Sequence, residues 1–290
     1  MAKVTVAATQ MACSWNVEEN VANAEKLIRQ AAAEGAQIIL IQELFEAPYF
    51  CIEQHPKHFD LATSVEENTT IKRFSELAKE LEVVLPLSWF ERAGKAFFNS
   101  LVVIDADGTV MDVYRKSHIP NDPGYQEKQY FSPGDTGFMV WETRYAKIGV
   151  GICWDQWFPE TARCLALKGA ELLFYPTAIG SELNNDHDSM AHWQTVMQGH
   201  AAANVMPVIA SNRIGSEKAT ASDDQMTFYG SSFIADQSGQ KVKEANRTDE
   251  GILVHTFDLE EVRVMRERWG LFRDRRPDLY GPIATYDGNA

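Results

Sequence analysis

The chain has 290 residues, and its 45% hydrophobic and 23% charged residues are ordinary globular values that exclude a disordered or fibrous protein. Its formal net charge of −14 argues against a nucleic-acid partner, because phosphates need a basic surface, and weakly favours cationic small molecules. We see neither a long apolar run nor a secretory leader, so we expect a cytoplasmic protein without membrane association. Its four cysteines stand far apart and fit neither a disulfide framework nor a zinc ribbon: Cys13, Cys51, Cys153 and Cys164.

The first part of the chain predicts a strand, a helix and a second strand. Residues 4–9 form the first strand, Asn16 caps a helix over 17–34, and residues 38–41 are a buried strand. Glu43 follows this strand directly. An acid at the end of a core strand is costly to bury, so Glu43 is either a cap or salt-bridge partner, or a functional acid.

A predicted hairpin leads into a long irregular segment. After a helix that ends at residue 81 and a strand over 83–90, the Asp107-Gly108 turn connects strands 98–105 and 110–114. The hairpin runs into Lys116, and residues 121–137 are then rich in Pro, Gly and aromatic residues. Long loops of this kind inside a compact domain usually carry function.

Cys153 stands at a predicted strand-to-helix elbow. Residues 147–152 form a short buried strand, and Pro159 and Glu160 begin a helix that continues through residue 168. A side chain at such an elbow lies at the C-terminal edge of a sheet, where N–H groups of the next turn can bind an oxyanion. Free cysteine is also among the most buried residue types, so a structural thiol and a nucleophile are equally compatible with this stretch.

The remaining segments predict one α/β domain over residues 1–290, with a mixed sheet or two sheets covered by helices. The last ~20 residues, about 270–290, are polar and contain prolines, which predicts an arm across the surface or a partner. The predicted elements of this half are strands 171–175, 205–210 and 252–256, helices 187–203 and 259–268, and a hairpin of 231–235 with 241–244.

Three predicted strand ends thus carry an acid, an ammonium and a thiol: Glu43, Lys116 and Cys153. A nearby cation lowers a thiol pKa and a base takes its proton, so Lys116 fits the cation and Glu43 the base. Lys116 could also stabilise an oxyanion beside the N–H of Trp154. Spacing alone does not establish that the three side chains meet.

The three segments QELFEAPYF, YRKSHIPNDPGYQEKQYFSPGD and GVGICWDQWFPE together resemble the nitrilase superfamily of carbon–nitrogen hydrolases, over nearly the whole chain. The resemblance implies a four-layer αββα sandwich with Glu43 as general base, Lys116 as oxyanion stabiliser and Cys153 as nucleophile, and no metal or organic cofactor. Glu127 matches a second glutamate that binds the lysine and positions substrate. The resemblance also implies a homo-oligomer built from dimers.

Residues around the thiol bear on the substrate. Relatives that hydrolyse N-carbamoyl amino acids typically carry arginine or histidine just after the nucleophile, where this chain has Gln156 and Trp157. Glu182 supplies a negative charge in a loop, unless it is simply a solvated acid. We therefore expect a small cationic ureido substrate, bound by Glu127, Trp154, Glu182, Tyr49 and Tyr130; N-carbamoyl amino acids, ω-amides and a non-catalytic binding module are the alternatives.

Two other constellations remain open. A papain-like pair would join Cys153 to His118 or His192, although the flanking sequences do not match that family. A metal hydrolase would use His187, Asp188 and His192 on one helix, although this spacing lacks the glutamate of HExxH.

Overall fold

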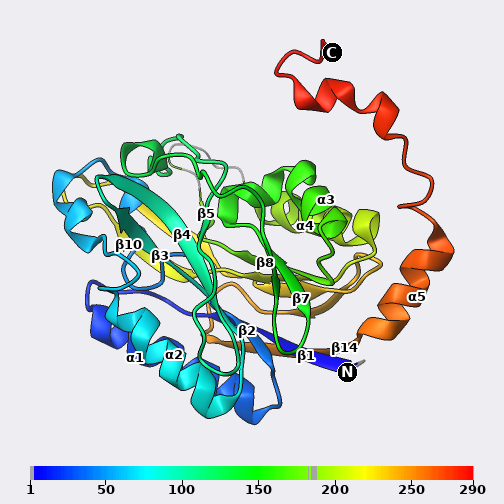
Figure 1. Cartoon of the computed structure of the whole chain (residues 1–290). Coiled ribbons are helices and arrows are strands. Elements are labelled where there is room, and N and C mark those ends of the chain that lie inside the picture. Colours follow the sequence, from blue (N-terminus) through cyan, green and yellow to red (C-terminus); the bar gives the residue numbers. More distant parts are fainter. Residues whose placement is uncertain (1–2, 182, 184–187, 290) are drawn as a thin grey trace.

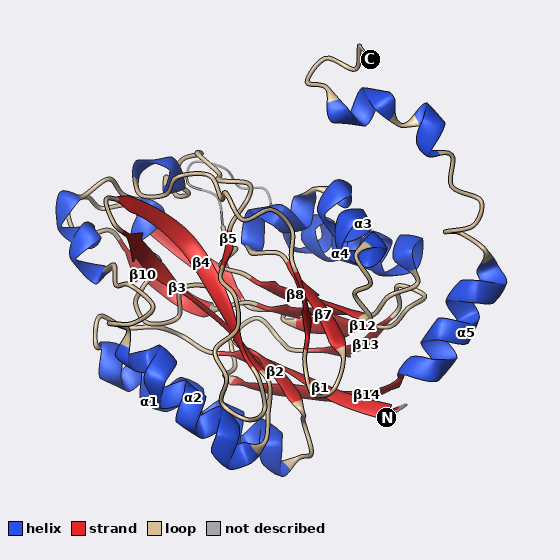
Figure 2. Cartoon of the chain, in the orientation of Figure 1, coloured by secondary structure: helices blue, strands red, loops and turns tan. Residues whose placement is uncertain are grey.

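The computed structural model describes residues 3–181, 183 and 188–289 of the chain. Two β-sheets pack face to face, and helices cover both outer faces, so the molecule has four layers (Figures 1 and 2). On one side lie α1 (Val17–Ala33) and α2 (Thr69–Leu81); on the other lie α3 (Pro159–Leu167) and α4 (Met190–Asn204). The expected αββα sandwich is confirmed.

The first sheet combines a parallel pair with antiparallel neighbours. β2 pairs in parallel with β1, and β14 pairs antiparallel with the other edge of β1. β3, β4 and β5 form an antiparallel meander that meets β2 through a bridge between Ile38 and Val84. The bounds are β1 (Lys3–Gln10), β2 (Ile38–Leu40), β3 (Leu85–Ala93), β4 (Ala96–Ile104), β5 (Tyr114–Arg115) and β14 (Gly251–Asp258).

The second sheet has the strand order β13-β12-β9-β8-β7-β6, with β7, β8 and β9 parallel at its centre. A separate ribbon, β10 with β11, and the helix α5 complete the regular elements discussed below. The bounds are β6 (Val140–Glu142), β7 (Lys147–Val150), β8 (Leu172–Pro176), β9 (Val208–Ser211), β10 (Ile214–Lys218), β11 (Gln225–Tyr229), β12 (Phe233–Ala235), β13 (Lys241–Glu244) and α5 (Leu259–Trp269).

Successive side chains of each central strand point to opposite faces of the sheet. One set packs between the two sheets and the other packs under the helices. In β2, Ile38 and Leu40 pack between the sheets, whereas Ile39 packs under α1 and α2. In β8, Phe174 faces the other sheet and Leu173 faces the helical layer of α3 and α4. Burying each such side chain stabilises the fold by about 1.5–3 kcal/mol. Both faces of these strands are therefore apolar, which is why they read as continuous hydrophobic runs.

Most predicted elements are present, and the helix cap predicted at Asn16 is confirmed, whereas the cap at Asn68 was not predicted. Asn16 Oδ1 accepts the N–H of Glu19, and Asn68 Oδ1 accepts that of Ile71. The strand expected at residue 205 begins only at Val208, because Val205 adopts the left-handed conformation that ends α4 (φ 46°). β6 and the β10–β11 ribbon were not predicted from the sequence.

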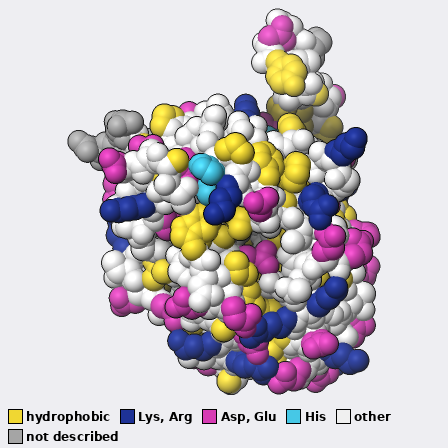
Figure 3. Space-filling view, turned by 90° about the vertical axis from the view of Figure 1, so that its left-hand side faces the viewer, with side chains coloured by type: hydrophobic (Ala, Val, Ile, Leu, Met, Phe, Trp, Pro, Cys, Tyr) yellow, Lys and Arg dark blue, Asp and Glu magenta, His cyan; other side chains and the backbone are white. Residues whose placement is uncertain are grey.

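The segment after α5 extends away from the body and ends in two short 3-10 helices, Pro277–Leu279 and Gly281–Ala284 (Figures 1 and 3). On the face drawn in Figure 3, acidic and basic side chains are interspersed. Within the described part of the chain, no helix combines the length and apolar character needed to cross a bilayer.

Candidate active site

The structure brings the predicted acid and ammonium together beside the thiol, between the two sheets. Glu43 follows β2, Lys116 follows β5, and Cys153 comes three residues after the end of β7. Lys116 Nζ lies 2.9 Å from Glu43 Oε1. Their exposed fractions are 0% for Glu43, 0% for Lys116 and 4% for Cys153. Side chains from three strand ends of two sheets therefore lie in one site that is shielded from solvent.

The backbone at Cys153 forms a tight elbow. Cys153 has φ 41°, the left-handed region that costs a non-glycine residue roughly 1–2 kcal/mol, and it begins the 3-10 helix η4 (Cys153–Trp157). This short helix, not α3 directly, follows the thiol. The N–H of Trp154 lies in its first turn, where a helix supplies no acceptor of its own. The predicted role of this N–H as an oxyanion donor stays a prediction.

Asp155 holds the backbone turn at Cys153 in place through hydrogen bonds of its carboxylate. Its carboxylate accepts the N–H of Ile152 at 2.9 Å and the Tyr114 hydroxyl at 2.7 Å. It also accepts the N–H of His118 at 3.0 Å and lies 2.7 Å from His118 Nδ1. Because Tyr114 and His118 flank Lys116 in sequence, Asp155 ties the lysine segment to the cysteine segment.

Lys116 is a buried cation between two carboxylates. Its Nζ donates to Glu127 Oε2 at 2.7 Å as well as to Glu43. Burial alone would lower the pKa of Lys116, but the charges of Glu127 and Glu43 outweigh burial and hold that pKa well above its usual value. Burial is also the main reason that the pKa of Glu127 is raised. Lys116 therefore stays charged.

A glycine allows the lysine segment to be overlaid by the irregular loop. Gly134 donates its N–H to the Lys116 carbonyl at 2.8 Å, and a Cβ at this position would lie 2.0 Å from the Arg115 carbonyl oxygen. No residue with a side chain fits there without moving the backbone. This is the physical reason for glycine in the SPGD part of the motif.

Glu43 has one engaged and one free oxygen. Oε1 accepts from Lys116 and from Asn99 Nδ2, the latter at 2.6 Å. Oε2 is buried and has no hydrogen-bond partner among the described residues. A buried carboxylate oxygen without a donor is costly and is suited to accept a proton. Asn99, on β4, was not predicted; its only signal was a buried asparagine within a hydrophobic strand.

The thiol is neutral in this environment. Burial and then the charge of Glu43 raise the pKa of Cys153 well above its usual value, although Lys116 opposes the shift. Cys153 Sγ lies 3.8 Å from the Ala178 carbonyl oxygen, to which it donates weakly. A nucleophilic role therefore requires a base that removes the proton as the sulfur attacks, and Glu43 Oε2 is the free acceptor nearby.

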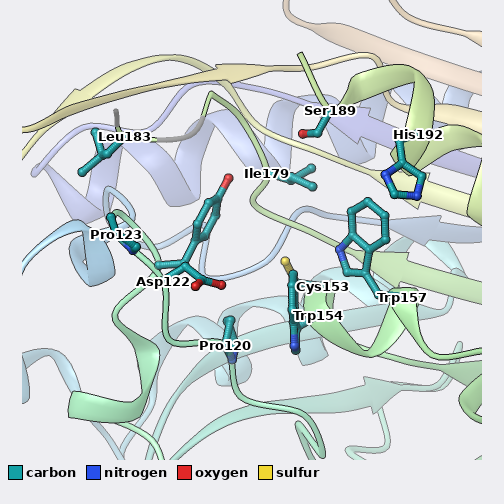
Figure 4. Close-up of a pocket in the computed structure, with 11 residues that line it drawn as sticks. Pro120, Asp122, Pro123, Cys153, Trp154, Trp157, Ile179, Leu183, Ser189 and His192 are labelled. Atoms are coloured by element: carbon teal, nitrogen blue, oxygen red, sulfur yellow. The ribbon is translucent and has the colours of Figure 1, made fainter. Parts of the chain in front are cut away.

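Cys153 opens into a pocket of about 520 Å³ (Figure 4). Three aromatic residues line it: Trp154, Trp157 and Tyr125. Asp122 is the acidic side chain among the described lining residues, and it is exposed at the pocket. The other lining residues are Pro120, Pro123, Ile179, Leu183, Ser189 and His192. The walls are mostly apolar, with charge confined to a few positions.

The other predicted substrate-binding residues lie in different places. Tyr49 is buried behind the pocket, and its hydroxyl donates to Glu127 Oε1 at 2.6 Å. The Tyr130 hydroxyl donates to the Glu53 carbonyl at 2.7 Å, and its ring packs on Phe50. Neither tyrosine is among the residues that line the pocket. Glu182 lies outside the described residues, so its position stays a prediction.

The two alternative constellations gain little support. The His118 imidazole is engaged by Asp155 and stacks on Phe158, with ring centroids 3.7 Å apart. His192 does line the pocket, where its ring meets that of Trp157. Among residues 3–181, 183 and 188–289, no cluster of His, Cys, Asp or Glu is arranged to hold a metal ion, and His187 falls outside these ranges.

An αββα sandwich with a buried thiol, a carboxylate with a free oxygen and a paired ammonium defines a class of cysteine-dependent amide hydrolases. The family described as carbon-nitrogen hydrolase matches residues 5–267. The chain therefore belongs to the carbon–nitrogen hydrolases of the nitrilase superfamily, and it is an enzyme of this family.

Relatives with known names cover nearly the whole chain. It is 58% identical to an N-carbamoylputrescine amidase of Oryza sativa subsp. japonica, over 99% of this chain and 96% of that protein. It is 57% identical to a citrullinase of Francisella tularensis, over 98% and 99%. The crystal structure of a carbon-nitrogen hydrolase from Helicobacter pylori G27 superimposes with a TM-score of 0.92 at 40% identity, covering 98% and 99% of the two chains.

Proposed function

We propose that the chain hydrolyses N-carbamoylputrescine to putrescine, ammonia and carbon dioxide. The observation that carries the proposal is the likeness to N-carbamoylputrescine amidases over almost the full length of both chains, together with the Glu43–Lys116–Cys153 site. The apolar pocket suits a chain of about four methylenes, each worth roughly 0.8 kcal/mol when buried.

The proposed reaction has two stages. Cys153 Sγ attacks the ureido carbonyl while Glu43 takes the thiol proton, and Lys116 with the Trp154 N–H stabilises the oxyanion. Glu43 returns the proton to the departing amide nitrogen, and ammonia leaves a thiocarbamate on the sulfur. Water, deprotonated by Glu43, then attacks this thiocarbamate. The thiol reforms, and the released carbamate loses carbon dioxide to give the amine.

The remaining roles concern binding. Glu127 holds Lys116 in place, and Tyr49 holds Glu127. Trp154 on the pocket wall offers a ring face for a cation. Glu182 remains our first choice for the substrate's terminal ammonium. Asp122, which the sequence analysis missed, supplies a further negative charge on the wall. Tyr130 acts only indirectly, through the packing around Phe50.

The wider setting is also proposed. An enzyme with this substrate belongs to polyamine biosynthesis, and we place it in the cytoplasm. Residues 1–290 form a single hydrolase domain, and the arm at about 270–290 reaches a second copy of the chain in a homo-oligomer built from dimers. Its exposed apolar side chains support this role: Leu279, Ile283 and Tyr286.

A second candidate is the hydrolysis of citrulline or another ureido amino acid. It is favoured by the 57% identity to the Francisella citrullinase and by His192, which adds a possible anion partner to the same pocket as Asp122. A zwitterionic substrate end needs both kinds of partner.

Purified protein should be assayed for ammonia release from N-carbamoylputrescine, citrulline, an ω-amide and neutral butylurea at equal concentrations. We expect the highest kcat/KM on N-carbamoylputrescine. Cys153→Ser should abolish turnover and also the covalent adduct seen by mass spectrometry. A preference for citrulline selects the second candidate; no ammonia from any of these compounds favours a binding module; full activity of Cys153→Ser removes the mechanism.

A further inference from the structure

Arg213, between β9 and β10, is a fully buried cation whose guanidinium contacts the backbone of Glu43. Its Nη2 donates to the Glu43 carbonyl at 2.7 Å and to the Leu44 carbonyl at 3.0 Å. Its Nη1 donates to the Ala47 carbonyl at 3.3 Å. The guanidinium therefore binds three backbone acceptors of one turn, and that turn starts with Glu43.

This turn needs such support. Leu44 has φ 49°, a left-handed conformation that costs a residue with a side chain roughly 1–2 kcal/mol. Glu43 and Leu44 are both buried, so their carbonyl groups have little access to water and must find donors in the protein. Arg213 supplies these donors with a rigid planar fork, which holds several acceptors in one fixed geometry.

Glu217, on β10, completes the arrangement. Its carboxylate accepts from Arg213 Nη1 at 2.9 Å and also accepts the N–H of Tyr49. The Tyr49 hydroxyl in turn donates to Glu127, which binds Lys116. The Arg213–Glu217 pair thus contacts the segment 43–49 at both ends, one end carrying the proposed base and the other supporting the partner of the lysine.

We propose that the Arg213–Glu217 pair is a positioning device that sets where Glu43 and Glu127 stand around Lys116. Neither residue of the pair lines the pocket, and the hydrogen bonds of both go to the backbone of segment 43–49 instead. Buried ion pairs add little net stability compared with apolar replacements. Arg213 donates its hydrogen bonds to the turn that carries Glu43, the proposed base. We therefore expect the pair to affect the rate of the chemical step more than the stability of the fold. The inference rests on the proposed role of Glu43 as base.

The test compares Arg213→Met, Arg213→Lys and Glu217→Gln with the parent protein. Arg163→Met is the control, because Arg163 also donates to one backbone carbonyl, that of Ala203, in a different part of the fold. For each variant, kcat, KM and the rate of Cys153 alkylation by iodoacetamide at pH 7 are measured, and circular dichroism with thermal unfolding reports the fold.

In Arg213→Met we expect kcat and the alkylation rate to fall together by about 10²-fold with KM changed little, because a shift of about 1 Å at a catalytic group has that effect. Arg213→Lys, which keeps the charge but not the fork, should recover part of both rates. Glu217→Gln should lie between, and Arg163→Met should stay within twofold of the parent.

Folded Arg213→Met protein with kcat and alkylation within twofold of the parent overturns the proposal. A change in KM alone in Arg213→Met also overturns it, as does an equal loss of kcat and alkylation rate in Arg163→Met. If Arg213→Met does not fold, the same criteria apply to Arg213→Lys and Glu217→Gln. Alkylation does not depend on the substrate, so a failure of the proposed substrate would leave this readout intact. A wrong base would instead show as normal alkylation in Glu43→Gln.

Discussion

At the scale of single residues, the site combines a thiol that is neutral at rest with a base that keeps one oxygen free. The thiol stays protonated because burial and the charge of Glu43 raise the pKa of Cys153. Glu43 Oε2 is left without a donor while Oε1 is held by Lys116 and Asn99. Proton transfer between these two groups is therefore expected only as the sulfur bonds to carbon.

Glu43→Gln tests this arrangement. We expect kcat to fall by about 10²- to 10⁴-fold, the usual range for a lost general base. Without the base, alkylation of Cys153 depends on free thiolate, so its rate should rise with pH from pH 7 to 9, because burial, the main reason that the pKa of Cys153 is raised, remains when the charge of Glu43 is removed. Stopped assays with iodoacetamide across this range measure the slope.

Glu46→Gln is the matched control for this variant. Glu46 belongs to the same segment, but its carboxylate faces Asn68 at 3.4 Å instead of Lys116. The kcat of Glu46→Gln and the pH dependence of its Cys153 alkylation rate should match those of the parent protein. Equal losses in the two variants would show that the segment as a whole is sensitive, not the base.

Charge at the far end of the substrate is a second residue-scale prediction. A charge-assisted contact is worth roughly 1.5–3 kcal/mol, so Glu182→Gln should lower kcat/KM on N-carbamoylputrescine about 10- to 150-fold. Asp122 is exposed and screened by solvent, so Asp122→Asn should lower it only about 2- to 5-fold. On neutral butylurea, both variants should stay close to the parent; equal losses on the two substrates would exclude charge recognition.

At the scale of elements, short segments between strands are held against one another by buried carboxylates. Glu53 is one example, at the end of η1 (Phe50–Ile52). Its carboxylate accepts the N–H and the hydroxyl of Thr220 at 2.7 and 2.6 Å and the N–H of Ala221 at 2.8 Å. It thereby fixes the loop between β10 and β11, the ribbon that carries Glu217.

Glu53→Gln should lower the free energy of unfolding by about 1.5–3 kcal/mol at pH 7, the usual contribution of a hydrogen bond to a charged group. Although burial opposes ionisation, the bonds from Thr220 and Ala221 lower the pKa of Glu53 from 4.5 to about 2. The folded state therefore binds this proton less readily than the unfolded state.

The stabilising contribution of Glu53 is then complete above pH 4.5 and is lost as the pH falls toward 2. Urea unfolding of the parent and of Glu53→Gln should show their difference shrinking from pH 6 to pH 3. A difference that stays constant over this range would mean that the charge of Glu53 does not contribute.

At the scale of the whole molecule, the arm beyond α5 contacts the body at its start, where the Arg163 guanidinium lies over the Phe272 ring, but it exposes large apolar side chains further on. Leu279 and Ile283 each keep 61% of their surfaces exposed, and exposed apolar patches often mark a partner's binding site. Beyond its start, the segment also stands clear of the body (Figure 1). These features support its proposed exchange between copies.

Removal of residues 271–290 should therefore lower the oligomeric state and leave the sandwich folded. Sedimentation at micromolar concentration should show the full chain as a dimer or larger and the shortened chain as a smaller species, with unchanged far-ultraviolet circular dichroism per folded residue. A full chain that sediments as a monomer would refute the assembly, and an unfolded shortened chain would show that the arm belongs to the domain.

Local patterns in the sequence determined most of the elements and the chemical types at the site. The apolar runs of β2, β7 and β8 are readable because both of their faces are buried, and Asn16 marks a helix start because a cap is a local hydrogen bond. The same runs placed an acid, a lysine and a thiol at strand ends. The motifs around them also indicated the family.

Only the tertiary structure decided which of these groups meet and what holds them. Lys116 reaches Glu43 and Glu127 through contacts between residues far apart in the chain, and Asn99 and Arg213 complete the site from β4 and from beyond β9. Tyr49 and Tyr130, which are equally aromatic in the sequence, do not line the pocket, and their hydroxyl groups bond to Glu127 and to the Glu53 carbonyl. No local pattern records such pairings, since a buried polar group is satisfied by whichever strand the fold packs against it.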